Sequence, residues 1–340
     1  MSFERITIES EVRLSALTMG EGPLILCAHG FPGLSLCYEA QLKTFASAGY
    51  RVVAPDMRGY GRSERPRQVE AYEARRISDD ILAILDHFGE ETAVLIGHDF
   101  GARAIFGFAL HHPSRARALI SLGVPYGAQF HGAQAKEESA SGKGRRRLPS
   151  EVFRSIAEKH FFHMHYFQER GRAERDLAKA PGDFLARLYF ALSARGKLLD
   201  MRQFPSDGTS YLDVLAPAPS PFAIDGLDEE ALGRIVVEYT SVDDSDLFFI
   251  GGLNAYRVMD LDAVNDAEYA MAPLPQPALF LGGARDPVRS ILNERSIASM
   301  RDRLPGLVAI EWIEGAGHFV HIERAEAVNR AILAFLNQLR

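Results

Sequence analysis

The sequence of 340 residues predicts an α/β fold in which helices flank a mostly parallel sheet and a long helical segment is inserted. Two observations lead to this prediction. Short apolar runs rich in β-branched residues recur along the chain, and segments with apolar residues every three or four positions lie between several of them. This alternation of strand-like and helix-like segments is absent between about residues 128 and 272 and then resumes. The length exceeds one average domain, which suits a single core that carries an insertion.

Six apolar runs are the predicted strands, and a run that is apolar throughout suits a parallel strand covered on both faces. They occupy residues 24–28, 51–54, 92–96, 118–122, 277–281 and 308–313. Helical spacing is clearest in two segments, at Ile77, Ile81, Ile84, Leu85 and Phe88, and at Val328, Ile332, Phe335, Leu336 and Leu339. The alternation of strands and helices predicts right-handed crossover connections within one sheet.

The interruption of the strand–helix alternation predicts the domain organisation. Residues 1–127 and 273–340 are expected to form the core, and residues 128–272 a mainly helical cap. The inserted interval is aromatic and rich in loops, with a Pro-rich patch "APAPSPF" at 216–222. We expect these aromatic residues to line an apolar pocket for a small molecule.

Composition excludes several classes of protein. With 47% hydrophobic and 24% charged residues the chain is expected to be soluble and globular, and nothing indicates global disorder. A net charge of -7 argues against a general nucleic-acid binder, and the basic run at 143–147 is interpreted as a solvated loop. The beginning of the chain has no apolar signal segment, and no stretch of about 18 apolar residues suggests a membrane span. Two cysteines, Cys27 and Cys37, form no disulfide or metal framework, so a reducing cytoplasm is expected.

Reactive residues follow four of the predicted strands. His29, Asp99, Asp286 and His318 each come just after an apolar run, where ligands bind in open parallel sheets. Asp99, Asp286 and His318 form a nucleophile, acid and histidine series in chain order. The same order is found in the α/β-hydrolase arrangement, where a small-x-nucleophile-x-small turn presents the nucleophile above the sheet.

The nucleophile in this turn is a carboxylate. Gly97 and Gly101 flank Asp99, and the helix that begins near Phe100 favours its ionised form. A carboxylate that attacks a saturated carbon with a leaving group, or a strained ring, forms an alkyl-enzyme ester. Water then hydrolyses this ester, with His318 as general base.

The other predicted roles follow from this hydrolysis. We expect the pKa of His318 to lie near neutrality, as a general base requires. Asp286 would orient its ring. The backbone N–H groups of Phe31 and Phe100 are predicted to stabilise the charge that develops on the Asp99 oxygen.

Structural roles remain open for these residues. Taken alone, Asp99 is also compatible with a helix N-cap, and Asp286 with a turn at Arg285-Asp286-Pro287. His321 competes with His318 for the role of base. His29, His98, Asp56 and Arg58 are interpreted as architectural.

With these residues assembled, the chain resembles the epoxide hydrolases of the α/β-hydrolase fold over nearly its whole length. The core motifs are "HGFPG", "DMRGYGRSERP", "GHDFGA" and "GAGHFVHIERAEAVN", and the cap motifs are "YFQERGRAERDL" and "GGLNAYRVMDLD". The resemblance implies a hydrolase acting on ether bonds that converts a small apolar epoxide and water to a vicinal diol, with no organic cofactor and no metal. It also implies a cis peptide bond between Phe31 and Pro32.

The resemblance further implies two cap side chains that donate protons to the epoxide oxygen. Tyr256 occupies the place of one of them. The other place, usually a tyrosine, is held by His163 here, which departs from the family pattern. An imidazole N–H can also donate, but His165 and Tyr166 are neighbours, and the run "HFFHMHYFQ" is also compatible with an aromatic core face.

Other functions remain as alternatives. A haloalkane dehalogenase would place a tryptophan after the nucleophile, where Phe100 stands, and the only tryptophan is Trp312. A haloacetate dehalogenase would place an arginine there, although Arg103 lies one turn further. A serine esterase is disfavoured by Asp99, and a non-catalytic ligand receptor would not need the three residues together. The sequence leaves open the natural epoxide, its stereochemistry, a homodimer, and the order of residues 131–149.

Overall fold

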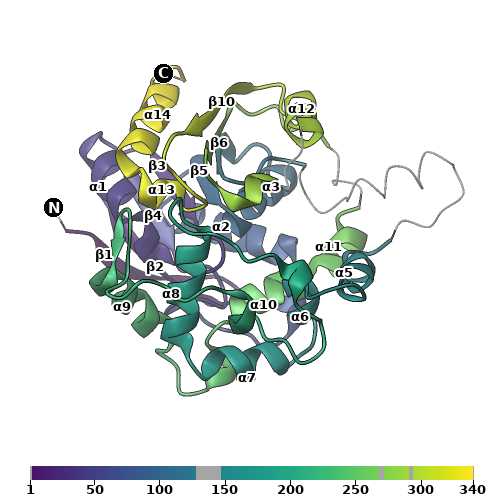
Figure 1. Cartoon of the computed structure of the whole chain (residues 1–340). Helices are drawn as coiled ribbons and strands as arrows, with labels where there is room; N and C mark the ends of the chain where they lie inside the picture. The colour runs from purple at the N-terminus through teal and green to yellow at the C-terminus, as the bar shows by residue number, and fades with distance from the viewer. Residues whose placement is uncertain (1, 128–146, 268–271, 291–293, 340) are drawn as a thin grey trace, which may run out of the picture.

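The structure is a computed structural model that describes residues 2–127, 147–267, 272–290 and 294–339. The basic run at 143–147 lies, apart from Arg147, outside the described residues, and so does most of the segment 131–149. Figure 1 shows a central sheet with helices on both sides and further helices gathered in the lower half of the view.

An eight-stranded sheet in the order β1-β2-β4-β3-β5-β6-β9-β10 forms the centre. From β4 to β10 neighbouring strands are parallel, whereas β1 and β2 are antiparallel to each other and β2 is antiparallel to β4. The strands are β1 (Glu4–Glu9), β2 (Arg13–Met19), β3 (Leu24–Ala28), β4 (Arg51–Pro55), β5 (Ala93–His98), β6 (Ala116–Leu122), β9 (Ala278–Gly283) and β10 (Leu307–Ile313). All six predicted strands are therefore present.

The sequence did not predict β1 and β2. The outer strand β1 reads ERITIE and is only partly buried, with a mixture of polar and apolar residues. A search for runs that are apolar throughout finds strands covered on both faces and misses such an edge strand. The fold class is unaffected, because β1 and β2 only extend the sheet at one edge.

Helices cover both faces of the sheet. On one face, α1 (Glu39–Ser47) and α14 (Ala325–Asn337) share an apolar cluster that includes Phe45 and Ile332. On the other face, α2 (Ala74–His87) and α3 (Phe100–His111) bury residues such as Ile84 and Phe108 in a second cluster. The two segments with helical spacing are α2 and α14. The core half also holds α12 (Glu294–Arg303), α13 (Val320–Glu323), η1 (Ser35–Tyr38), η2 (Val69–Tyr72) and η6 (Pro287–Ser290).

The inserted elements lie in the chain between β6 and β9, which are neighbours in the sheet. They are α5 (Pro149–Ala157), α6 (His163–Tyr166), α7 (Arg172–Ala178), α8 (Pro181–Leu192), η3 (Met201–Gln203), η4 (Leu212–Val214), β7 (Ala223–Ile224), β8 (Leu227–Asp228), α9 (Glu229–Tyr239), η5 (Ser245–Leu247), α10 (Ile250–Arg257) and α11 (Met259–Asn265). The only strands among them are the two short ones of the β7–β8 hairpin. Because β6 and β9 pair directly, the sheet continues across the point of insertion.

Aromatic packing joins the inserted helices to the core. Phe31, in the loop after β3, lies between the rings of Phe167, Phe184 and Phe249, with centroid distances of 6.2 to 6.4 Å. These residues belong to the same apolar cluster as the α2–α3 face of the sheet. The inserted helices therefore share one apolar core with the α2–α3 face of the sheet.

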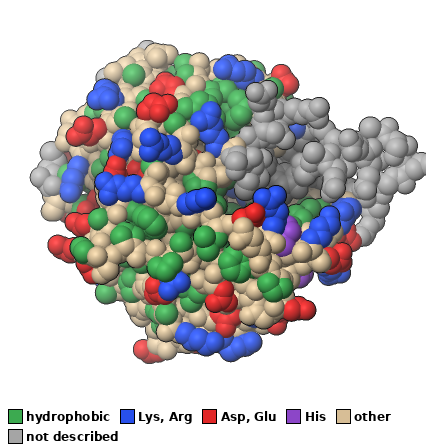
Figure 2. Space-filling model, viewed as in Figure 1, with side chains coloured by type: hydrophobic (Ala, Val, Ile, Leu, Met, Phe, Trp, Pro, Cys, Tyr) green, Lys and Arg blue, Asp and Glu red, His purple; other side chains and the backbone are tan. Residues whose placement is uncertain are grey.

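The surface is mixed in character. Figure 2 shows acidic and basic side chains interspersed over the face in view. No helix in the described part of the chain is both long and apolar enough to cross a bilayer.

Candidate active site

Asp99 occupies a strained turn between β5 and α3. Its φ is 53° and its ψ is -118°, and it is the only non-glycine residue with positive φ that the described ranges contain. Such a conformation persists only where the surrounding structure imposes it. A Cβ on Gly97 would come within 2.3 Å of the Gly101 carbonyl oxygen, and a Cβ on Gly101 within 1.9 Å of the Ala28 carbonyl oxygen. The two glycines are therefore required for the close approach of α3 to the sheet. Asp99 stands at the N-cap position of α3, but its side chain makes no cap bond to the helix.

The structure brings Asp99, Asp286 and His318 together. Asp286 follows β9, and His318 follows β10. Nδ1 of His318 lies 3.0 Å from Oδ2 of Asp286 and donates a hydrogen bond to it. Nε2 of His318 lies 3.8 Å from Oδ2 of Asp99, which is within ion-pair distance but too long for a hydrogen bond. The imidazole thus stands between two carboxylates.

These neighbours control the protonation of His318. Burial by itself lowers the pKa of this histidine, but the charges of Asp286 and Asp99 raise it to about 10. The sequence-based expectation of a pKa near neutrality was wrong, because it did not account for two adjacent carboxylates. Burial acts in the opposite direction on Asp99, yet His318 and the Phe31 N–H hold its pKa below the usual value. The neighbouring carboxylates therefore favour the protonated form of His318, and His318 in turn favours the ionised form of Asp99.

One of the two predicted backbone donors is bonded to Asp99. The N–H of Phe31 donates to Oδ1 at 3.0 Å, whereas the N–H of Phe100 makes no bond to this carboxylate. Gly30 permits the approach, because a Cβ there would lie 2.3 Å from Oδ1. The Phe31–Pro32 peptide bond is cis, as the resemblance implied. Oδ1 thus already lies against a backbone donor, while Oδ2 faces His318.

Tyr256 and His163 lie together on the inserted side of the site. The ring of Tyr256, on α10, contacts Phe100 edge to face at 4.9 Å, and the ring of His163, on α6, lies 5.9 Å from that of Tyr256. Burial lowers the pKa of His163 to about 4, against the opposing charge of Asp99. Burial and the charge of Asp99 raise the pKa of Tyr256 well above its usual value. Both side chains are therefore neutral near pH 7 and lie within the field of Asp99.

The neighbours of His163 point elsewhere. The hydroxyl of Tyr166 donates to Asp176 at 2.8 Å. The charges that act on His165 are those of Arg154, Arg172 and Glu169, and Asp99 is not among them. Of the three candidates for the second donor, only His163 is close to Tyr256 and to the charge of Asp99.

Sequence reasoning missed Tyr211. This residue is 5% exposed, and its ring stacks on that of His163 at 5.5 Å with an interplanar angle of 15°. Burial raises its pKa, and the charge of Asp99 raises it further, so Tyr211 also borders the site. It lies in a loop-rich stretch with no motif, and no spacing links it to His163. Only the packing of the inserted segment reveals it.

The residues interpreted as architectural make hydrogen bonds that hold loops of the core. They are His29, Asp56, Arg58 and His98, and Nε2 of His98 contacts the His318 carbonyl oxygen at 2.9 Å. Nε2 of His29 accepts from the Met57 N–H at 3.0 Å, and Arg58 makes a buried bidentate pair with Asp80. Asp56 accepts hydrogen bonds from loop residues that include the Ser35 N–H. The competing histidine His321 makes no hydrogen bond or ion pair with Asp99, and its ring lies 4.6 Å from that of His98.

The ring of His321 stacks on that of Tyr38 at 4.8 Å, and burial lowers the pKa of His321 well below its usual value.

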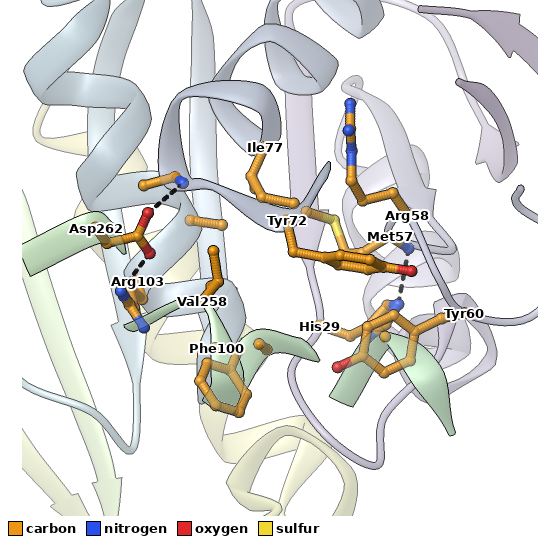
Figure 3. A pocket seen from close by; sticks show the side chains of 14 residues that line it. His29, Met57, Arg58, Tyr60, Tyr72, Ile77, Phe100, Arg103, Val258 and Asp262 are labelled. Atoms are coloured by element: carbon orange, nitrogen blue, oxygen red, sulfur yellow. Dashed lines mark hydrogen bonds and ion pairs between the residues drawn. The ribbon is translucent and has the colours of Figure 1, made fainter. Parts of the chain in front are cut away.

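A cavity of about 60 Å³ lies behind the ring of Phe100 (Figure 3). Most of its lining is apolar, and small residues at 74, 104, 251 and 255 leave the space open. The ion pair between Arg103 and Asp262, at 2.6 Å, closes one side of it. The lining residues are His29, Met57, Arg58, Tyr60, Tyr72, Ala74, Ile77, Phe100, Arg103, Ala104, Gly251, Ala255, Val258 and Asp262. Arg103, which a haloacetate dehalogenase would need for its substrate, is thus already paired.

Within the described residues, no cluster of three or more His, Cys, Asp or Glu side chains is arranged to hold a metal ion. Cys27 and Cys37 are both free and buried.

Comparisons with known proteins place this site in a family. Residues 23–164 match the model of the α/β hydrolase fold. The chain is 34% identical to epoxide hydrolase A of Mycobacterium tuberculosis over 99% of its own length and 98% of that protein. The chain belongs to the epoxide hydrolases.

Solved structures agree with this assignment. An epoxide hydrolase from an endophytic Streptomyces superposes with a TM-score of 0.85 at 32% identity, over 99% of this chain and 96% of that one. Epoxide hydrolase A of Mycobacterium thermoresistibile gives a TM-score of 0.83 at 33% identity, over 99% and 98% of the two chains. The family and the α/β-hydrolase fold predicted from the sequence are confirmed. The dehalogenase alternative is not favoured, since these relatives are epoxide hydrolases.

Proposed function

We propose that this protein converts an epoxide and water to a vicinal diol through a covalent ester on Asp99. One observation carries the proposal. The Asp99 carboxylate has one oxygen on the Phe31 N–H and the other facing His318, which is itself held by Asp286. This arrangement supplies a nucleophile, a charge-stabilising donor and a base around one carbon atom.

The first step opens the ring. Oδ2 of Asp99 forms a bond to an epoxide carbon, and the carbon–oxygen bond of the ring breaks with its electron pair remaining on the oxygen. Tyr256 and His163 are the donors that we assign to this oxygen, because both are neutral and face the charge of Asp99. We assign the attack to Oδ2 because Oδ1 is already engaged by the Phe31 N–H.

The second step hydrolyses the ester. A water molecule attacks the ester carbonyl carbon while His318 removes one of its protons, and negative charge develops on Oδ1 beside Phe31. Collapse of this intermediate releases the diol and restores the Asp99 carboxylate. Ester formation removes the charge of Asp99, one of the two anions that raise the pKa of His318. The pKa of His318 therefore falls once the ester has formed, and the imidazolium releases a proton that restores the cap donor which protonated the ring oxygen. Neutral His318 then accepts the proton of the attacking water.

The experiment measures diol formation from a terminal aromatic epoxide by wild type and Asp99→Ala. Halide release from chloroacetate and fluoroacetate is measured in parallel. Diol from wild type that is absent with Asp99→Ala supports the proposal. Halide without diol would instead establish a dehalogenase, and no product of either kind would reject both.

The finer assignments belong to the same proposal. We take residues 128–272 as a cap over a core of residues 1–127 and 273–340, which is supported by the direct pairing of β6 with β9. The substrate is a small apolar epoxide, in keeping with the apolar lining behind Phe100. No metal or organic cofactor takes part in either step. We place the protein in the cytoplasm. Measurement of its mass in solution would test whether it forms a homodimer.

A further inference from the structure

Glu323, the last residue of α13, is a buried carboxylate outside the three-residue array. It is 5% exposed, and no cation in the described part of the chain lies within ion-pair distance of it. The adjacent Arg324 pairs with Asp225 instead. Burial of an ionisable group without a counter-charge is unfavourable unless hydrogen bonds replace its water.

Backbone N–H groups from two distant segments replace that water. Oε1 of Glu323 accepts from the Gly317 N–H at 3.1 Å, and Oε2 accepts from the Ala194 N–H at 2.7 Å. Gly317 immediately precedes His318, whereas Ala194 follows the end of α8 in the inserted segment. One carboxylate therefore bridges the histidine loop and the inserted helices.

A further contact joins the same two segments directly. The N–H of His318 donates to the carbonyl oxygen of Leu192 at 2.9 Å. The two backbones are so close that a Cβ on Gly317 would lie 2.3 Å from the Ala194 nitrogen. We call these contacts of Leu192, Ala194, Gly317 and Glu323 the α8–histidine junction. The N–H of Gly317 is thus held by Glu323, and the N–H of His318 by the end of α8.

The position of His318 matters most for ester hydrolysis, although its charge also favours the ionised form of Asp99. In the proposed mechanism, ring opening requires Asp99 and the cap donors, while ester hydrolysis requires a water aligned between His318 and the ester carbonyl. Loss of the junction would let the histidine loop shift more than the Asp99 turn, because β5 and α3 hold that turn and Nε2 of His98 on β5 still contacts the His318 carbonyl oxygen at 2.9 Å. A change in the junction should therefore slow the second step more than the first.

We propose that Glu323 is a positioning residue for ester hydrolysis. Through its two hydrogen bonds it links the position of the inserted helices to the position of His318. This inference rests on the proposed function. It concerns a residue that does not touch the reacting atoms and acts through the backbone of the histidine loop.

The test compares Glu323→Gln with Asp225→Asn. Glu323→Gln replaces one acceptor oxygen by an NH₂ group that cannot accept either backbone N–H. Asp225 also bridges the two halves, because it pairs with Arg195 and Arg324, but it does not touch the histidine loop. Asp225→Asn is thus a control for a general loosening between the halves.

The measurements are rapid mixing with a terminal aromatic epoxide and intact mass spectrometry of the quenched protein. For Glu323→Gln we expect ester formation at the wild-type rate, hydrolysis slowed by about 10- to 100-fold, and accumulated ester. Asp225→Asn should match wild type in both steps. Equal slowing of both steps by Glu323→Gln, or unchanged kinetics in a folded variant, would overturn the inference.

Glu323→Asp keeps the charge but shortens the reach of the carboxylate, so it separates position from charge. Accumulated ester in this variant supports positioning, whereas wild-type kinetics would show that charge alone suffices and reject the inference. Wild-type protein that forms neither ester nor diol would instead reject the proposed function, so the two failures are distinguishable.

Discussion

The two sides of the candidate active site are built by different means. On the core side, Asp99, Asp286 and His318 are charged and are held by a strained turn, close glycine contacts and short hydrogen bonds. On the inserted side, Tyr256 and His163 are neutral, and their rings are held by aromatic contacts. Nδ1 of His163 is buried without a hydrogen-bond partner in the structure. The core side is fixed by backbone geometry, and the inserted side is fixed by packing.

This difference has a chemical meaning. Covalent attack and ester hydrolysis need defined angles between charged groups, which rigid strand ends supply. Proton donation to an epoxide oxygen needs neutral donors, which burial in an aromatic environment supplies by shifting their pKa values. Variants of His318 on the core side should therefore fail at ester hydrolysis, and variants of Tyr256 on the inserted side at ring opening.

The largest effect is expected for His318→Gln. Without the base, hydrolysis of the ester should slow by about 10²- to 10⁴-fold while ring opening continues. Intact mass spectrometry after exposure to an epoxide should then show protein carrying one substrate. An unchanged mass would contradict the assignment of His318 to the second step.

The same histidine should make stability depend on pH. Its pKa is raised to about 10 in the folded state against 6.5 for the unfolded chain, so its contribution is complete below pH 6.5. That contribution is lost as pH rises from 6.5 to about 10, and it amounts to about 3 to 5 kcal/mol. Urea unfolding across this range should show wild type losing stability relative to His318→Gln. Parallel curves for the two proteins would mean that the resting array is not charged as described.

Removal of a cap donor should have a smaller effect on the first step. We expect Tyr256→Phe to slow ring opening by about 100-fold, with His163 as the remaining donor. Tyr166→Phe is the matched control, because it removes a hydroxyl that is bonded to Asp176. Single-turnover measurement of ester formation distinguishes them. Equal rates for the two variants would remove Tyr256 from the site.

The smallest effect concerns the cavity behind Phe100. Ala255→Leu places a larger side chain into this space of about 60 Å³. We expect about a tenfold loss of kcat/KM for epoxides with a bulky second substituent, and little change for a small terminal epoxide. The small epoxide also reports whether the variant is folded. A uniform loss on both substrates would show that the cavity does not receive the substituent.

Most of the core side was predictable from the sequence. The turn around Asp99 is specified by residues that are close together in the chain, namely an apolar strand, two glycines and a helix. Asp286 and His318 follow strands whose carboxyl ends must meet in a parallel sheet. Strands β1 and β2 were missed because neither is apolar throughout: β1 is a partly exposed edge strand, and β2 reads RLSALTM, although most of β2 is buried.

The sequence by itself determined six of the eight strands of the sheet, the nucleophile turn and the chain order of the three charged residues, because local backbone constraints and strand alternation are short-range properties. Only the tertiary structure decided the stacking of Tyr211 on His163, the bridge of Glu323 to Ala194 and the raised pKa of His318. Each of these depends on residues that packing brings together from distant parts of the chain. Proximity in space between residues that are far apart in the chain leaves no periodic signal in the sequence.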